Sequence, residues 1–343
     1  MARQIRSMDG STLAAQAVAG DRRAVARLLS LVENGDPEGK VALAGLFPRT
    51  GRAHIIGFTG STGAGKSTLL NCVAREVRSR GVSLAVVAVD PSSPFSGGAL
   101  LGDRLRMRDL VEDPGVFIRS MASRGHPGGV AEATRDVVML FDALDVPVVL
   151  VETVGAGQAQ VDVARIAHTV VLVEAPGMGD EIQVLKAGLT EIADIIVVNK
   201  ADRPEAKRTL QALRSVHTRG KPGAGHHGAS VDQTPTAPDE AWTVPILQTT
   251  ALDGEGVPAL VDAIEAHRDY LQAGERWQAL HRRHARAELE VWLQRLLRAL
   301  VDEHIDAGAF EEALSSVVRR DRDPASAAQE LLVKLIRSLA SQS

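Results

Sequence analysis

The 343-residue sequence contains a single cysteine, Cys72, which excludes both an intrachain disulfide and a cysteine-based metal cluster. Aromatic residues make up only 3% of the chain, and the formal net charge is −4. Because positive and negative residues are interspersed, composition gives no electrostatic reason to expect nucleic acid. No segment approaches the roughly 18 uninterrupted apolar residues of a membrane span. We therefore expect no nucleic-acid or membrane partner, a cytoplasmic location, and a buried structural role for Cys72.

The apolar residues that are present fall into helical and strand patterns. With 45% hydrophobic and 24% charged residues, the chain can bury a core in one large or two modest domains. Residues 12–33 have apolar positions at helical spacing and predict one amphipathic helical prelude. From Ile55 onward, β-branched runs alternate with amphipathic stretches, which is typical of an α/β protein whose mostly parallel sheet is covered on both faces.

Two later segments depart from this alternation. Residues 217–241 are rich in Gly, Pro, Ser and Thr, and predict a surface loop. From Glu275 the pattern is helical, and apolar residues from Trp277 to Leu300 lie on one stripe. We predict a separate helical arm whose stripe is either core or a contact with a second chain.

Residues 57–68 contain the pattern G-x-x-x-x-G-K-[ST], with an apolar segment before it and an amphipathic pattern after it. In such a P-loop, backbone N–H groups cradle the β-phosphate and the start of the helix adds a partial positive charge. We expect Lys66 to span the β- and γ-phosphates and the Ser67 hydroxyl to face Mg²⁺. The predicted phosphate-binding residues are Gly60, Ser61, Gly63, Ala64, Gly65, Lys66, Ser67 and Thr68.

The segment from Asn199 to Asp202 reads N-K-x-D and follows an apolar strand pattern, at the end of a strand where open α/β sheets bind ligands. The Asp202 carboxylate can accept hydrogen bonds from N1–H and the 2-amino group of guanine, a pair that adenine lacks. Asn199 is expected to brace the loop, and the stem of Lys200 to cover the base. Thr250, Ala251 and Leu252 are expected to supply backbone near the guanine carbonyl. The sequence therefore predicts GTP and GDP as ligands.

Acidic residues end two further strand patterns, at Asp90 and Glu152, and Asp103 is a third candidate. Because Mg²⁺ is commonly held by one or two carboxylates together with substrate phosphates, we predict these three residues and Ser67 as magnesium ligands. For Asp103, a surface position at the start of a helix stays open as an alternative.

The segment from Glu152 to Gly155 reads E-x-x-G, so the Gly155 N–H is expected to contact the γ-phosphate. Small G proteins carry a water-orienting glutamine directly after this glycine, whereas this chain has Ala156 there and Gln158 two positions later. We therefore expect slow unassisted hydrolysis. The candidate catalytic residues are Lys66, Asp103, Glu152 and Gly155.

Taken together, the motifs resemble the MeaB/ArgK-type G proteins that accompany adenosylcobalamin-dependent methylmalonyl-CoA mutase. The resemblance rests on the P-loop with "DPSSPF", "GGALLGD", "ETVGAGQ" and "PGMGDEIQVLKAG", within a similarity that extends from about residue 20 to 270. It departs at Ser61 and Thr62, where the family usually has prolines, and at His126, Pro127 and Gln160. The change at Ser61 and Thr62 removes prolines but leaves the phosphate-contacting positions of the P-loop intact, whereas the changes at His126, Pro127 and Gln160 concern switch contacts and not nucleotide binding.

The resemblance implies a SIMIBI-class P-loop G domain at residues 51–270, a helical extension at 1–50, and a helical arm at 271–343 used for homodimerisation. It implies that Asp90, Asp103 and Glu152 surround Mg²⁺ and its waters. It also implies that GTP hydrolysis gates cofactor delivery to an acyl-CoA mutase and protects that mutase. Gln183 and Lys186 occupy the positions of a switch that senses the mutase.

Three other functions stay open from sequence. A metallochaperone GTPase of the same fold is disfavoured because such proteins typically need clustered Cys and His near the active site. A kinase of a transport system is disfavoured by the guanine-selecting N-K-x-D and by the absence of an obvious acceptor-binding module. A structural dimer that binds nucleotide without turnover is compatible with the same motifs.

Overall fold

We analysed a computed structural model, which describes residues 9–90, 108–122, 129–153, 163–177, 189–219 and 241–342. The chain divides into two compact units, Met1–Leu280 and His281–Ser343. None of the helices within these described ranges combines the length and apolar character needed to cross a bilayer.

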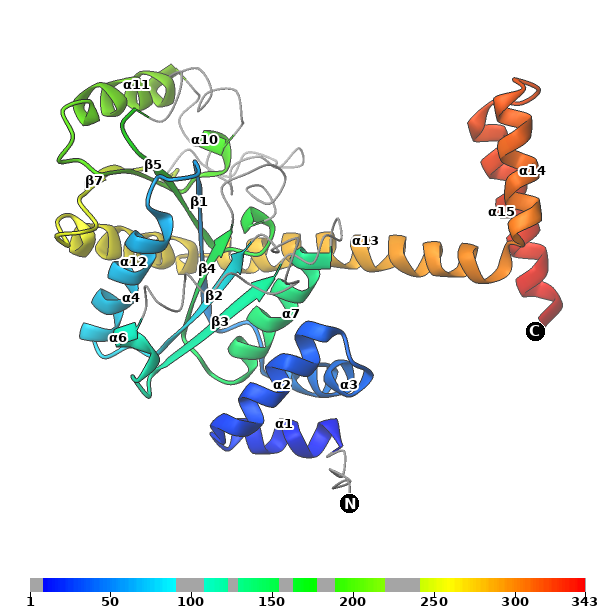
Figure 1. Cartoon of the computed structure of the whole chain (residues 1–343), viewed down its shortest axis with the longest axis horizontal. Helices are drawn as coiled ribbons and strands as arrows, with labels where there is room; N and C mark the ends of the chain where they lie inside the picture. The colour runs from blue at the N-terminus through cyan, green and yellow to red at the C-terminus, as the bar shows by residue number, and fades with distance from the viewer. Residues whose placement is uncertain are drawn as a thin grey trace. The chain divides into compact units, whose positions relative to one another are not determined.

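The first unit is built on a seven-stranded parallel sheet with strand order β3-β2-β4-β1-β5-β6-β7 (Figure 1). Its strands are β1 (His54–Gly60), β2 (Leu84–Asp90), β3 (Val116–Ala122), β4 (Val148–Thr153), β5 (Thr169–Glu174), β6 (Ile195–Asn199) and β7 (Ile246–Thr249). Each strand coincides with an apolar run seen in the sequence. The predicted α/β class with a mostly parallel sheet is therefore confirmed.

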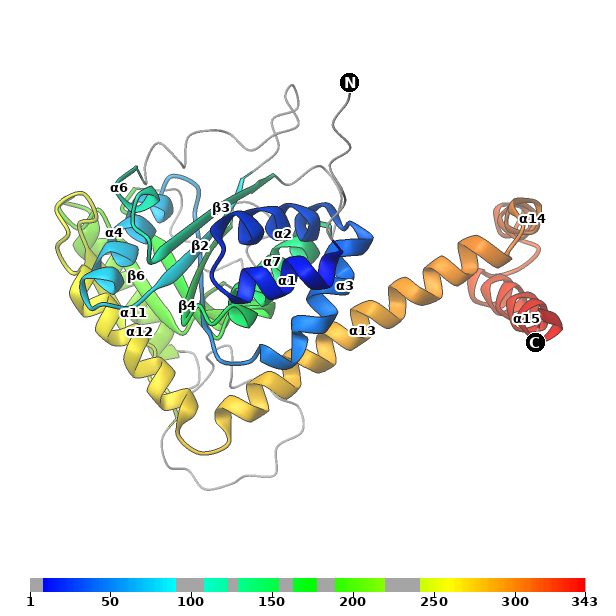
Figure 2. The same ribbon diagram turned by 90° about the horizontal axis from the view of Figure 1, so that it is seen from below.

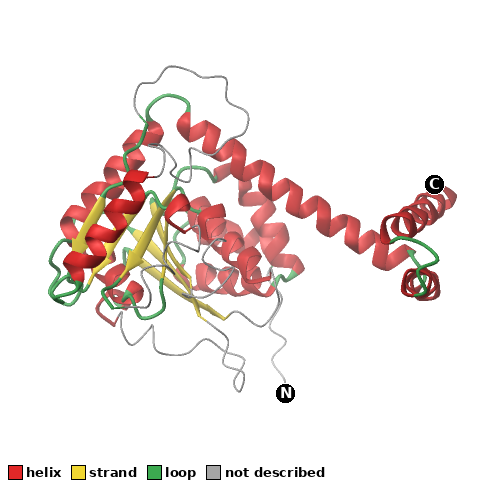
Figure 3. Cartoon of the chain, turned by 90° about the horizontal axis from the view of Figure 1, so that it is seen from above, coloured by secondary structure: helices red, strands yellow, loops and turns green. Residues whose placement is uncertain are grey.

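Helices cover both faces of this sheet (Figure 3), so β5 and β6 are buried along their whole length. On one face, α4 (Lys66–Ser79) and α12 (Val257–Gln272) pack on a cluster that includes Phe58 and Leu150. On the other face, α7 (Gly129–Ala143) packs on Val87 and Val149. This unit also contains α6 (Arg108–Val111), α10 (Leu189–Ile192), α11 (Ala206–Arg219), η1 (Phe47–Arg49) and η2 (Val163–Arg165).

The N-terminal extension consists of three helices packed with α7 (Figure 2): α1 (Gly10–Val18), α2 (Arg22–Asn34) and α3 (Pro37–Leu46). The helical prelude predicted over residues 12–33 consists of two helices, α1 and α2. Gly20 has a φ of 89°, which ends the first helix. The Asp21 side chain then accepts hydrogen bonds from the N–H groups of Arg23 and Ala24, and so caps the second helix.

The entry into β1 is fixed by the buried carboxylate of Asp142 on α7. It accepts hydrogen bonds from the backbone N–H groups of Gly51, Arg52 and Ala53, at 2.8 Å in the case of Ala53. Three donors converging on one carboxylate hold the chain where it turns from the extension into the strand that precedes the P-loop.

The second unit contains most of α13 (Arg276–His304), with α14 (Ala307–Val318) and α15 (Pro324–Gln342). The predicted apolar stripe is divided between two environments. Trp277 packs on His168 with ring centroids 4.5 Å apart, and Leu280 is buried, so both belong to the first unit. Leu289, by contrast, is 61% exposed in this chain, and Leu293 and Leu296 are exposed as well.

The predicted loop at residues 217–241 begins later than expected, because α11 continues through Arg219. Residues 220–240 lie outside the described residues.

Candidate functional site

The P-loop connects the end of β1 at Gly60 to the start of α4 at Lys66. Gly60 has a φ of 132°, and a side-chain Cβ there would lie 2.0 Å from the Val173 carbonyl oxygen. Gly65 has a φ of 89°, and a Cβ there would lie 2.5 Å from the Asn199 side-chain nitrogen. Both positions therefore require glycine for backbone conformation and for space.

Lys66 is buried within the P-loop, where its Nζ donates to the carbonyl oxygens of Gly60 at 3.0 Å and Ser61 at 2.9 Å. Burial lowers the pKa of Lys66, while the carboxylates of Glu152 and Glu174 act in the opposite direction. Lys66 is the first residue of α4, so its positive charge and the dipole of the helix N-terminus both favour binding of an anion here.

Ser67 and Glu152 come together beside this lysine. The Ser67 hydroxyl donates to Glu152 Oε1 at 2.7 Å, and Glu152 is buried at the end of β4, which pairs with β1. A hydroxyl and a carboxylate are hard oxygen donors of the kind that Mg²⁺ takes alongside phosphate oxygens, so the pair fits the predicted ion.

Asp90 is the last residue of β2, and β4 lies between β2 and β1 in the sheet. The side chain of Asp90 lies outside the described residues. Asp103, Gly155, Gln183 and Lys186 lie outside them altogether. Within the part of the chain that is described, no three His, Cys, Asp or Glu side chains form a group able to hold a metal.

Asn199 joins three segments of the site. Its buried Nδ2 donates to the Ala64 carbonyl at 2.9 Å, while Oδ1 accepts from Thr249 Oγ1 at 3.1 Å and from the Ala251 N–H at 3.2 Å. Lys200, in the left-handed conformation with φ 57°, donates from Nζ to the Gly63 carbonyl at 2.8 Å. The P-loop, the end of β6 and the loop after β7 are therefore held as one unit.

Asp202 lines a cavity of about 750 Å³ beside these loops. Arg203, Lys207 and Thr250 are also among its lining residues, and a backbone bridge between Thr250 and Glu255 shapes the loop after β7. Leu252, at the tip of that loop, is almost fully exposed. The structure thus places the N-K-x-D segment and the 249–256 segment at one open edge of the sheet.

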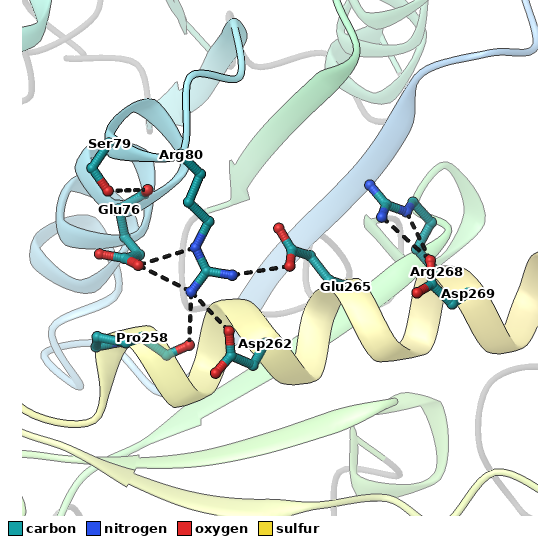
Figure 4. Close-up of polar contacts among 8 residues, drawn as sticks. All are labelled: Glu76, Ser79, Arg80, Pro258, Asp262, Glu265, Arg268 and Asp269. Atoms are coloured by element: carbon teal, nitrogen blue, oxygen red, sulfur yellow. Dashed lines mark hydrogen bonds and ion pairs between the residues drawn. The ribbon is translucent and has the colours of Figure 1, made fainter.

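A single arginine ties the helix after the P-loop to the helix after the 249–256 loop (Figure 4). Arg80, just beyond α4, contacts Glu76 at 3.0 Å, Asp262 at 2.8 Å and Glu265 at 2.9 Å. Its guanidinium also donates to the Pro258 carbonyl at 3.4 Å. Because Asp262 and Glu265 lie on α12, this cluster holds α12 against α4.

Sequence reasoning missed two side-chain contacts at the site. Glu174, at the end of β5, accepts a hydrogen bond from Ser61 Oγ at 2.8 Å; an acid ending a strand pattern was the signal that had pointed to Asp90 and Glu152. Cys72 is half-buried rather than fully buried, and its Sγ donates to the Ala251 carbonyl at 3.0 Å. Burial raises the pKa of the Cys72 thiol, which favours the protonated donor form.

Comparison with known proteins assigns the chain to a family. Residues 25–309 match the family described as methylmalonyl Co-A mutase-associated GTPase MeaB. A putative GTPase from Pyrococcus horikoshii is 45% identical over 319 residues, which cover 92% of this chain and 95% of the relative. GTPase ArgK from Escherichia coli is 32% identical over 321 residues, covering 91% and 92%.

Among solved structures, one described as LAO/AO transport system kinase has the same fold, with a TM-score of 0.70, 25% sequence identity, and coverage of 95% of this chain and 97% of that one. The relatives are named GTPases, and the P-loop and N-K-x-D segment of this chain are motifs of that class. The chain is a GTPase and belongs to the MeaB family.

Proposed function

We propose that this GTPase is a chaperone of an adenosylcobalamin-dependent acyl-CoA mutase of the methylmalonyl-CoA mutase type. GTP binding and hydrolysis gate delivery of the cofactor and protect the mutase from inactivation. The observation that carries the proposal is the family match over residues 25–309, because that family is described by its association with this mutase.

In this proposal the nucleotide lies along the edge where the strands end. The phosphates occupy the turn between Gly60 and Thr68, and the guanine base lies beside Asp202. Lys66 leaves the two P-loop carbonyls that hold it and donates to the β- and γ-phosphates. Support comes from the Asn199 hydrogen bonds, since they hold the phosphate-binding and base-binding loops in one arrangement.

Ser67 and Glu152 would hold Mg²⁺, with Asp90 and Asp103 as further predicted ligands. The ion, when bound, supplies positive charge that stabilises the developing charge on the transferred phosphoryl group. The chain's own contribution is to orient the Ser67 hydroxyl through Glu152 and to direct the Lys66 ammonium at the phosphates.

A homodimer formed through the helical arm is also part of the proposal. Leu293, Leu296, Leu314 and Ile336 are exposed on α13, α14 and α15. Exposed large apolar side chains on all three helices support an interface, and closed two-fold assembly is the commonest way to cover such side chains. Light scattering of the full chain tests this: a monomer would contradict it.

GTP turnover of the full chain, measured with and without purified mutase, tests the proposed function. We expect slow basal turnover, stimulated about tenfold or more by the mutase, a lowering of the barrier by about 1.4 kcal/mol. Lys186→Ala is expected to keep basal turnover within about twofold while losing most of the stimulation. Transfer of the γ-phosphoryl group to a protein instead of water would favour a transport-system kinase, the description given to the solved relative.

A further inference from the structure

A second acidic side chain contacts the P-loop from the strand opposite Glu152. In the sheet, β4 and β5 flank β1, so Glu152 and Glu174 approach the end of β1 from its two sides. Glu174 is 2% exposed. Its Oε2 accepts the Ser61 hydroxyl at 2.8 Å, and the backbone N–H of Ser61 also donates to this carboxylate.

The two acids contact different residues of the P-loop. Glu152 contacts Ser67, one of the residues that fits Mg²⁺, whereas Glu174 contacts Ser61 at the beginning of the P-loop. The negative charges of both carboxylates favour the protonated form of Lys66 and so raise its pKa. Burial raises the pKa of Glu174, because a charged carboxylate is disfavoured away from water.

The contacts also connect Glu174 to the lysine through the backbone. Glu174 holds the side chain of Ser61, and the Ser61 carbonyl in turn accepts a hydrogen bond from Lys66 Nζ at 2.9 Å. A nucleotide that takes Lys66 away from this carbonyl must break the second of these contacts. Its phosphates would also bring negative charge towards the Glu174 carboxylate.

From this geometry we infer that Glu174 is a positioning residue of the GTPase: through Ser61 it holds the P-loop in the arrangement in which Lys66 donates to the Ser61 carbonyl, and so weakens binding of both GTP and GDP. The inference rests on the proposed placement of the phosphates in the P-loop. Glu174 acts through Ser61 and Lys66 and is not assigned a contact with the nucleotide. Its consequence for turnover is faster release of GDP than the P-loop alone would allow.

The test compares nucleotide affinity in two charge-matched variants of the full chain. Glu174→Gln removes the charge but keeps an oxygen that accepts the Ser61 hydroxyl. Glu112→Gln removes one charge at an exposed position just before β3, at the edge where strands begin. Kd values and dissociation rates for GTP and GDP are measured with fluorescent nucleotide analogues at about pH 8, because burial raises the pKa of Glu174 and a pH well above the ordinary carboxyl value favours its charged form.

We expect Glu174→Gln to tighten binding of both nucleotides by about fivefold and to slow their dissociation, while Glu112→Gln stays within about twofold of wild type. Ser61→Ala, which removes only the hydroxyl contact, should shift affinity in the same direction by about twofold. If Glu174 instead held the P-loop in the arrangement that binds nucleotide, Glu174→Gln and Ser61→Ala would both weaken binding, so the sign of the affinity change distinguishes the two roles.

Unchanged or weaker nucleotide binding in Glu174→Gln, with a wild-type melting temperature, would overturn the inference. If Glu174→Gln does not fold, Ser61→Ala decides the matter by the sign of its affinity change. Lys66→Ala tests the placement of the phosphates separately from the role of Glu174. If this variant binds GTP normally, the placement of the phosphates is wrong. If it loses GTP while Glu174→Gln and Ser61→Ala are neutral, only the role of Glu174 is wrong.

Discussion

The two edges of the sheet both bury polar side chains, but they differ in access. At the edge where strands end, the hydrogen bonds of Asn199 hold loops that border an open cavity lined by Asp202. At the edge where strands begin, Thr169 Oγ1 lies 2.7 Å from His54 Nε2 and 2.8 Å from His267 Nδ1. Thr169 and His267 are both 0% exposed.

We call the edge where strands begin the closed edge and the edge where strands end the open edge. The closed edge contains residue types that elsewhere form a nucleophilic triad. His267 Nε2 lies 3.6 Å from Asp194 Oδ1, and Asp194 Oδ2 accepts the Val170 N–H at 2.9 Å. Trp242 Nε1 donates to the Asp194 carbonyl at 2.8 Å. Because substrate must reach a nucleophile, we interpret this threonine–histidine–aspartate group as a structural network that joins β1, β5 and α12 to Asp194, the residue before β6. Residue types that lie close together therefore do not define a catalytic site without access for a substrate.

The largest effect should follow loss of the positive charge at the open edge. Lys66→Ala is expected to weaken GTP binding by about 100-fold or more, because the buried ammonium is the predicted partner of the β- and γ-phosphates. Titration calorimetry with GTP measures this, with exposed Lys40→Ala as the control. Nearly unchanged affinity in Lys66→Ala would contradict the assignment.

Nucleotide choice at the same edge should depend on Asp202. In Asp202→Asn the amide can donate to the 2-oxo group of xanthine, which the carboxylate repels, so the ratio of XTP to GTP affinity should rise by about 100-fold. Competition binding with both nucleotides measures the ratio. A variant that still prefers GTP would show that another group reads the base.

The closed edge should respond in stability and not in activity. Thr169→Val keeps the shape of the side chain but leaves the two histidine nitrogens without the hydroxyl, at a cost of about 1–3 kcal/mol in the free energy of unfolding. GTP affinity and turnover should stay within about twofold. Loss of turnover with unchanged urea unfolding would show that the two edges are functionally coupled.

The closed edge also predicts a pH dependence of stability. Burial lowers the pKa of His54 from 6.5 to about 3. The unfolded chain therefore takes up a proton below about pH 6.5 that the folded chain does not, so this contribution to stability is present above pH 6.5 and is lost as pH falls towards 3.

Between pH 7 and pH 5 the loss from this one group should be about 2 kcal/mol. His54→Gln removes the titrating group, so its unfolding free energy should fall less over the same interval. Urea unfolding at both pH values measures the difference, and parallel losses in wild type and variant would contradict it.

The smallest effect is expected at the link between α4 and α12. Arg80→Met keeps the aliphatic stem but removes contacts to three carboxylates on a partly exposed surface, so we expect a loss of about 1 kcal/mol, reduced at high salt. Thermal unfolding at low and high salt tests it. A stability loss that does not depend on salt would point to packing instead of charge.

Local patterns in the sequence predicted the strands and the helix after the P-loop, because β-branched runs and helical periodicity are set by nearby residues. They did not predict how the apolar stripe from Trp277 to Leu300 is divided, since periodicity identifies an apolar face but not its partner. The contact between Ser61 and Glu174 and the network at Thr169 join segments far apart in the chain, which only the sheet topology brings together.

The most direct test of the central claim is a crystal structure of the full chain with Mg²⁺ and a non-hydrolysable GTP analogue. Our account predicts the phosphates between Gly60 and Thr68 with Lys66 Nζ on them, Mg²⁺ beside Ser67 and Glu152, and the base on Asp202. Nucleotide bound away from the P-loop, or with its base away from Asp202, would contradict the claim that this open edge is the GTPase site.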